Sequence, residues 1–171
     1  MYYDHFGLSE APFKITPNTD FFFSGGNRGP VLDALVYAIT RGEGMVKVTG
    51  EVGSGKTTFV QQLVRQMGNT ESVVSPTYVL MKKYKLPDGL NPFGLPRRFK
   101  TIVHIDAYRL EDPAEFKALQ PEEFLNDPSN LVVVEWPEKL GTLLPTPDVV
   151  LRFINDGIEG ERRIEMRGTT L

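Results

Sequence analysis

GEVGSGKTT, residues Gly50 to Thr58, is the stretch of this sequence that decides the fold. The pattern G-x-x-x-x-G-K-[ST] is filled in it by Gly50, Gly55, Lys56 and Thr57. Glycines let the backbone wrap a phosphate with its N–H groups pointing inward, and the N-terminus of a following helix adds a favourable dipole. In this pattern the lysine supplies a cation and the hydroxyl residue ligates magnesium. The stretch therefore predicts a loop that binds the phosphates of a nucleotide.

The residues on both sides of the loop support that prediction. MVKVT, which precedes it, is typical of a strand, and TTFVQQLVRQM has the helix formers and apolar spacing of a helix. A glycine turn with a solvated lysine is the competing interpretation, and the flanking strand and helix make it weaker. The residues expected to contact the nucleotide here are Gly50, Glu51, Val52, Gly53, Ser54, Gly55, Lys56, Thr57 and Thr58.

The composition is that of an ordinary folded protein, with 40% hydrophobic and 24% charged residues. Its 171 residues predict one globular domain over 1–171. The net charge of −3 argues against a domain that grips nucleic acid over a broad basic face. With no cysteine and only two histidines, no zinc site is expected, and magnesium is the metal to expect.

The chain shows no signal for export or membrane insertion. Its start, MYYDHFGLSE, has no basic segment followed by an apolar stretch, as a secretory signal would. No apolar run approaches the length of a membrane span. The cytoplasm is therefore the expected location.

Helices and strands alternate along the rest of the chain. Residues 1–28 are read as an irregular aromatic arm, and an amphipathic helix is predicted from Pro30 to Gly42. Two glycines and three prolines predict a long loop over 85–100, between the two strands of a hairpin. Strands are predicted in TYVLMKKY, TIVHID, NLVVVEW, DVVLRFI and RRIEMR, and short helices in AEFKAL and PEEFL. This mixture indicates an α/β sandwich.

Glu135 follows an apolar run, LVVV, that suits a central parallel strand buried on both faces. Ligand sites in such sheets gather at the carboxyl ends of strands, so Glu135 is expected near the phosphate loop, where it could hold magnesium directly or through water. The alternative is an ordinary acid at a strand end. Trp136 comes next, and packing is the expected role of its side chain.

The stretch TIVHIDAYRL places His104 and Asp106 on one side of a strand, with Ile105 facing the core on the other. Asp106 could position or deprotonate an attacking water, and a surface carboxylate paired with Arg109 is the alternative. His104 is expected to be structural. In SPTY, Thr77 could sense the γ-phosphate and magnesium as switch loops do.

Four stretches in this order, GEVGSGKTTFVQQL, SPTYVLMKKY, HIDAYRL and EWPEKLGTLLP, resemble the TsaE family, also called YjeE. These are small P-loop ATPases of the bacterial machinery that makes threonylcarbamoyladenosine in tRNA. The resemblance implies the α/β three-layer sandwich of P-loop NTPases, with a central, mostly parallel sheet and an antiparallel hairpin. It also implies ATP and Mg²⁺ as ligands and slow ATP hydrolysis. ATP is further favoured over GTP because the chain lacks an N-K-x-D guanine reader.

Roles for individual residues follow from the same resemblance. By it, Lys56 binds phosphates, Thr57 and Glu135 hold magnesium, Asp106 is the catalytic acid residue, Thr77 belongs to the switch and Trp136 lies beside the site. Asp106, Glu135 and Lys56 form the expected catalytic set. The TsaD and TsaB proteins are the implied partners, whose turnover ATP hydrolysis supports, and tRNA is expected to be contacted indirectly through that complex.

Two segments depart from the TsaE pattern. The first 48 or so residues resemble the start of ExeA/MshM-type secretion ATPases of the AAA class, although no AAA acid pair or sensor region follows. The chain is thus read as a mosaic. The long loop and its flanks concentrate positive charge, which suits a solvated loop or a contact with RNA or an acidic partner. The basic residues are Lys82, Lys83, Lys85, Arg97, Arg98 and Lys100.

Two other functions compete with the ATPase. In a small-molecule or nucleoside kinase, Arg97 and Arg98 would close over the phosphates and Asp106 would accept a proton from a substrate hydroxyl. In a non-enzymatic module derived from a secretion ATPase, the aromatic arm would form the contact surface with a partner. The aromatic residues of the arm could instead pack on the domain or line the adenine pocket.

Overall fold

A computed structural model describes residues 28–41, 44–70, 79–91, 94, 96–155 and 163–168. Thr77 lies outside these residues, and so does the expected aromatic arm except for Arg28 at its end. Within the described residues the expected helices and strands are present. In chain order the elements are α2 (Arg28–Arg41), β1 (Met45–Gly50), α3 (Lys56–Gln66), β2 (Met81–Lys85), β3 (Thr101–Asp106), α4 (Pro113–Lys117), α5 (Pro121–Leu125), β4 (Asn130–Glu135), the 3₁₀ turns η3 (Pro137–Lys139) and η4 (Gly141–Leu143), β5 (Val149–Ile154) and β6 (Arg163–Gly168).

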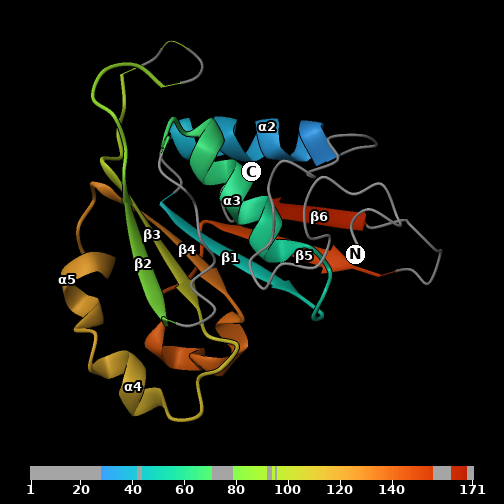
Figure 1. The fold of residues 1–171 in the computed structure, drawn as a ribbon, viewed down its shortest axis with the longest axis vertical. Helices are drawn as coiled ribbons and strands as arrows, with labels where there is room; N and C mark the ends of the chain where they lie inside the picture. Colours follow the sequence, from blue (N-terminus) through green and yellow to red (C-terminus); the bar gives the residue numbers. More distant parts are fainter. Residues whose placement is uncertain are drawn as a thin grey trace, which may run out of the picture.

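The six strands form one sheet in the order β2-β3-β4-β1-β5-β6. The four inner strands pair in parallel, and the two edge strands are antiparallel to their neighbours. The expected hairpin is β2–β3, and β5–β6 forms a second antiparallel pair at the other edge (Figure 1). The prediction of a mostly parallel central sheet with an antiparallel hairpin is therefore confirmed.

Helices cover both faces of the sheet, which makes the three layers of the predicted sandwich (Figure 1). One core cluster lies between the sheet and α2 with α3, and includes Leu35, Phe59 and Val133. The other lies on the face of α4 and α5, and includes Ile105 and Phe116. Side chains of β3 alternate between these two clusters, as the strand pattern predicts. Among the described residues, no helix combines the length and apolar character needed to cross a membrane.

The long loop over 85–100 extends the β2–β3 hairpin and is tied to the end of α3. The Leu86 N–H donates to the Lys100 carbonyl at 2.8 Å, which continues the hairpin pairing. The Arg97 guanidinium donates to the Met67 carbonyl, just after α3 ends. Because α3 has 11 residues, this anchor lies roughly 16 Å along the helix from Lys56. Arg97 is thus held away from the glycine loop, contrary to the arrangement that the kinase hypothesis requires.

Candidate functional site

The glycine loop connects β1 to α3 and needs glycine at two points for different reasons. Gly50 has φ 138°, and a Cβ there would lie 2.6 Å from the carbonyl oxygen of Phe153 on the neighbouring strand β5. Gly55 has φ 90° and immediately precedes α3, so it turns the chain into the helix. Both backbone angles are in the region that L side chains rarely adopt. The glycines at positions 50 and 55 of the sequence pattern are therefore required by the backbone of the loop.

Lys56 is bound to its own loop in this structure. Its ammonium donates to the carbonyls of Gly50 and Glu51, each at 2.7 Å, and to the Ser54 hydroxyl at 3.4 Å. It also lies 4.2 Å from the centre of the Trp136 ring, a cation–π contact. An ammonium has three hydrogens to donate, and these three contacts use all of them. Lys56 must exchange loop partners to bind a phosphate.

The surroundings of Lys56 are predominantly acidic. The side chain is only 4% exposed, and loss of hydration lowers the pKa of Lys56. Nearby carboxylates counteract that effect and raise the same pKa: Glu135, Asp106, Glu138 and Glu51. One ammonium therefore lies among four carboxylates in this part of the site.

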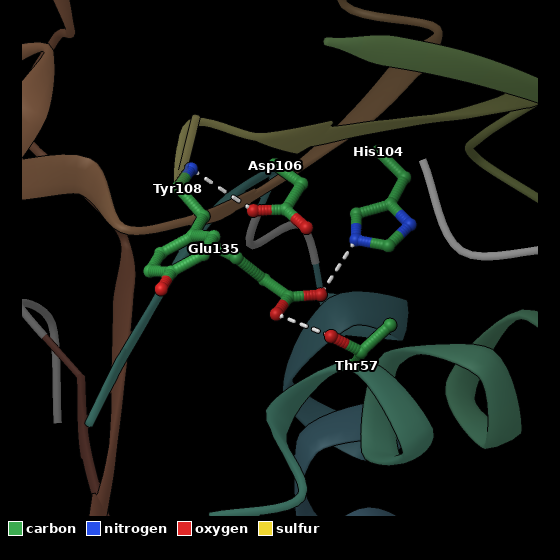
Figure 2. A network of polar contacts seen from close by, with 5 residues as sticks. All are labelled: Thr57, His104, Asp106, Tyr108 and Glu135. Atoms are coloured by element: carbon green, nitrogen blue, oxygen red, sulfur yellow. Dashed lines mark hydrogen bonds and ion pairs between the residues drawn. The ribbon is translucent and has the colours of Figure 1, made fainter. Parts of the chain in front are cut away.

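Glu135 ends β4 and is hydrogen-bonded through both carboxylate oxygens (Figure 2). The Thr57 hydroxyl, at the start of α3, donates to Oε2 at 2.8 Å. His104 Nε2, on β3, lies 2.8 Å from Oε1. Glu135 is 1% exposed and His104 is fully buried. Three elements thus converge on one buried carboxylate.

Asp106 stands opposite Glu135 in the parallel register of β3 and β4. It is 8% exposed, so it is not the surface carboxylate considered as an alternative above. The backbone N–H of Tyr108 donates to Asp106 Oδ1 at 3.1 Å (Figure 2). Burial raises the pKa of Asp106, the charge of Glu135 raises it further, and the Tyr108 hydrogen bond acts in the opposite direction.

Trp136 has a backbone conformation that is rare for a bulky residue. Its φ of 58° is left-handed, and this strain is of a kind that concentrates at functional sites. The ring lies against Tyr108, with ring centres 5.1 Å apart, and beneath the ammonium of Lys56. The ring also packs against the core cluster on the face of α4 and α5, which is the role expected from the sequence, and it lines the cavity described below.

These groups surround a cavity of about 340 Å³. Its walls are formed by Val52, Gly53, Ser54, Gly55, Lys56, Thr57, Thr58, Asp106, Tyr108, Glu135 and Trp136. A neighbouring cavity of about 540 Å³ shares Val52 and Trp136 with it. The second cavity is further lined by Thr49, Gly50, Glu51, Glu138, Arg152, Phe153, Ile154 and Asn155. Together they offer adjoining space for a phosphate chain and the rest of a nucleotide.

Most residues expected at the site are therefore neighbours in the structure. Gly50 and Glu51 border the second cavity, the other loop residues border the first, and Thr77 lies outside the described residues. Two contributors were not predicted as site residues, His104 and Tyr108. Alternation along β3 already placed His104 beside Asp106, which was a signal for it, but nothing in the sequence identified Glu135 as its partner.

The donor atoms suit magnesium. Thr57 and Glu135 offer oxygen atoms only, which is the ligand type that Mg²⁺ prefers, and they already lie within hydrogen-bond distance. Within the described residues, no group of three or more His, Asp or Glu side chains is gathered into a metal site. Magnesium is commonly held by one or two protein oxygens together with substrate phosphates, and Thr57 and Glu135 are two residues with such oxygens.

Comparison with known proteins finds a family whose model matches most of the chain. The family model described as threonylcarbamoyl adenosine biosynthesis protein TsaE matches residues 31–164. A relative named tRNA threonylcarbamoyladenosine biosynthesis protein TsaE, from Rickettsia bellii, is 35% identical over 127 residues, covering 72% of this chain and 79% of the relative. The protein of that name from Haemophilus influenzae is 32% identical over 126 residues, covering 74% and 71%.

Two further matches concern the resemblance to secretion ATPases and the fold. General secretion pathway protein A of Aeromonas hydrophila is 45% identical over 67 residues, which cover 39% of this chain and 12% of that protein. The crystal structure of Bacillus subtilis YdiB superposes with a TM-score of 0.53 at 20% identity, covering 84% of this chain and 81% of the other. That likeness concerns the fold alone. On the extent of the family match and the identity to its members, the chain belongs to the TsaE family of threonylcarbamoyladenosine biosynthesis proteins.

Proposed function

We propose that this chain binds ATP with magnesium beside the glycine loop and hydrolyses it slowly, as a subunit that supports threonylcarbamoyladenosine synthesis in tRNA. The observation that carries the proposal is the grouping of Lys56, the Thr57–Glu135 pair and Asp106 around one cavity. The biosynthetic role comes from the family and the names of its members. TsaD and TsaB are the proposed partners, through which tRNA would be reached.

Charge makes magnesium part of the proposal. Four carboxylates act on a single ammonium at Lys56, so a bare triphosphate would meet net negative charge. Thr57 and Glu135 would hold the ion. An ion held there would supply positive charge to offset the negative charge of the phosphates. Lys56 would then exchange its bonds to the loop carbonyls for phosphate oxygens.

Asp106 is the proposed general base. The oxygen of a water attacks the γ-phosphorus, the bond from that phosphorus to the β-phosphate oxygen breaks, and the proton of the water passes to the Asp106 carboxylate. The products are ADP and inorganic phosphate. Burial raises the pKa of Asp106 above its ordinary value, which makes it a stronger base than an exposed aspartate. The Tyr108 N–H fixes its orientation through Oδ1.

Phosphate release with ATP and Mg²⁺ tests the proposal, first with the chain alone and then with TsaD and TsaB. We expect slow release that changes when the partners are added. Lys56→Ala should abolish ATP binding, whereas Asp106→Ala should retain binding and lower turnover by roughly 10²–10⁴-fold, the usual contribution of a general base. Lys117→Ala, at an exposed lysine of α4, is the matched control and should behave as wild type.

Two results would contradict the proposal. Wild-type hydrolysis in both Lys56→Ala and Asp106→Ala would show that the site is wrongly assigned. Transfer of phosphate to a panel of small-molecule or nucleoside acceptors, faster than its release to water, would favour the kinase. The anchored position of Arg97 speaks against that outcome, because its guanidinium is held at the far end of α3 from the loop.

A further inference from the structure

We infer that His104 is a positioning residue, which holds the Glu135 carboxylate in the orientation that the magnesium site needs. The inference rests on the proposed function, since it concerns the same site. It goes beyond the expectation that His104 is structural. The ring belongs to β3, the carboxylate to β4 and its other partner, Thr57, to α3, so the contact links three elements at one point (Figure 2).

The geometry explains what the ring would do. A glutamate carboxylate rotates about its last side-chain bond with only a weak preference, so one hydrogen bond leaves its orientation loose. Here Thr57 contacts Oε2 and His104 contacts Oε1, each at 2.8 Å, so the two oxygens are fixed separately. The strand that carries His104 is itself held in register with β4, where His104 pairs with Val133. By holding Oε1, His104 therefore keeps Oε2 directed toward Thr57.

The second ring nitrogen shows that this contact comes at a cost. His104 is fully buried, and its Nδ1 has no hydrogen-bond partner among the residues that the structure describes. A buried polar atom left without a partner is destabilising, because it loses its hydration without gaining a hydrogen bond. An apolar side chain would fill this part of the core without that cost, so a purely packing role does not explain an imidazole here. The ring nitrogen Nε2 makes a hydrogen bond to Glu135, and it is the donor because an ionised carboxylate only accepts.

Two amide substitutions separate positioning from packing. In glutamine the side-chain nitrogen is the same number of bonds from Cβ as Nε2 of histidine, and in asparagine it corresponds to Nδ1. His104→Gln should therefore keep a donor near Glu135 Oε1, whereas His104→Asn should lose it. His104→Leu removes every polar atom. Loss of a hydrogen bond that orients a metal ligand typically weakens metal binding by about 10–100-fold.

The measurement is the Mg²⁺ dependence of ATP binding, followed by tryptophan fluorescence. The sequence contains one tryptophan, Trp136, and it lines the cavity, so the signal reports on the site without requiring turnover. His104→Asn and His104→Leu should raise the half-saturating Mg²⁺ concentration by about 10–100-fold. His104→Gln should stay close to wild type. ATP binding without Mg²⁺ should be the same in all four proteins.

Ile102→Ala is the control for loss of stability. Ile102 is fully buried on the same strand and side as His104, and it has no polar atom to offer Glu135. This variant should unfold at a lower temperature but keep the wild-type Mg²⁺ dependence. Equal Mg²⁺ dependence in His104→Asn and wild type would overturn the inference, and so would failure of both His104→Asn and His104→Leu to fold. If wild type itself binds ATP without regard to Mg²⁺, the proposed function fails instead.

Discussion

Asp106 and Glu135 are two almost fully buried residues that lie opposite each other in the register of β3 and β4. Such a pair lowers the stability of the folded protein at neutral pH, because burial and like charge both oppose ionisation of Asp106. Among the described residues, His104 and Lys56 are the groups whose charge opposes this increase in the pKa of Asp106. The residues that would perform the reaction are therefore expected to cost the unliganded protein some of its folding free energy.

Asp106→Asn should stabilise the protein without ligand while lowering turnover. The pKa of Asp106 is raised on folding, so the folded form of wild type is relatively favoured below the ordinary pKa of 3.8 and loses that advantage as pH rises through the folded-state value. The variant should gain a few degrees at pH 7, since about 1 kcal/mol corresponds to roughly 2–4 °C in a chain of this size. Thermal unfolding from pH 4 to 8 tests this. A gain that did not shrink toward pH 4 would show that charge is not the cause.

At the residue scale, sequence reasoning found the groups that have a fixed place in a motif. Lys56 and Thr57 are defined by spacing within the glycine loop, and Glu135 by its position at the end of an apolar strand. His104 was expected to be structural, because alternation gives the side of a strand and not the partner across it. Its contact with Glu135 depends on the parallel register of β3 and β4, which one sequence does not specify.

The glycine loop is the element whose backbone can be tested most sharply. Gly50→Ala would combine a φ of 138° with a Cβ 2.6 Å from the Phe153 carbonyl oxygen, a clash with backbone that cannot easily move. Gly53→Ala shares the positive φ, at 75°, but meets no atom within 4 Å. We expect Gly53→Ala to cost about 1 kcal/mol and Gly50→Ala clearly more. Urea unfolding measures both. Equal losses would show that close approach of β5 is not what selects glycine at position 50.

At the element scale, periodicity and turn residues were sufficient for the helices and strands, but not for all the pairings. The predicted hairpin joins β2 to β3, whereas the pairing of β5 with β6 was not predicted. The long loop illustrates the limit best. Its glycines and prolines predicted a loop, and its described residues after Lys85 contain no helix or strand beyond the Leu90–Pro96 bridge, but they could not show that Arg97 ties it to the end of α3. That contact lies between segments far apart in sequence.

At the scale of the whole molecule, the hydrophobic core extends as far as the edge strand β2. Tyr84 lies on β2 at the margin of the sheet, yet it is fully buried in the cluster between the sheet and α2 with α3. Burial raises the pKa of Tyr84 to about 12, from an ordinary value of 10.0. Near pH 10 the phenol loses its proton readily in the unfolded chain but not in the folded one. Alkaline pH therefore lowers the free energy of unfolding of the whole protein.

Unfolding free energy should therefore decline as pH rises from 10 to 12, and Tyr84 should account for part of that decline. A shift from 10.0 to about 12 corresponds to roughly 2–3 kcal/mol at full effect. Tyr84→Phe removes the ionisable group but keeps the ring, so its stability relative to wild type should improve across this interval, whatever the two differ by at pH 8. Urea unfolding at pH 8, 10 and 11 gives the comparison. A constant difference between the two proteins at all three pH values would mean that Tyr84 ionises as readily in the folded chain as in the unfolded one. Burial would then not raise its pKa.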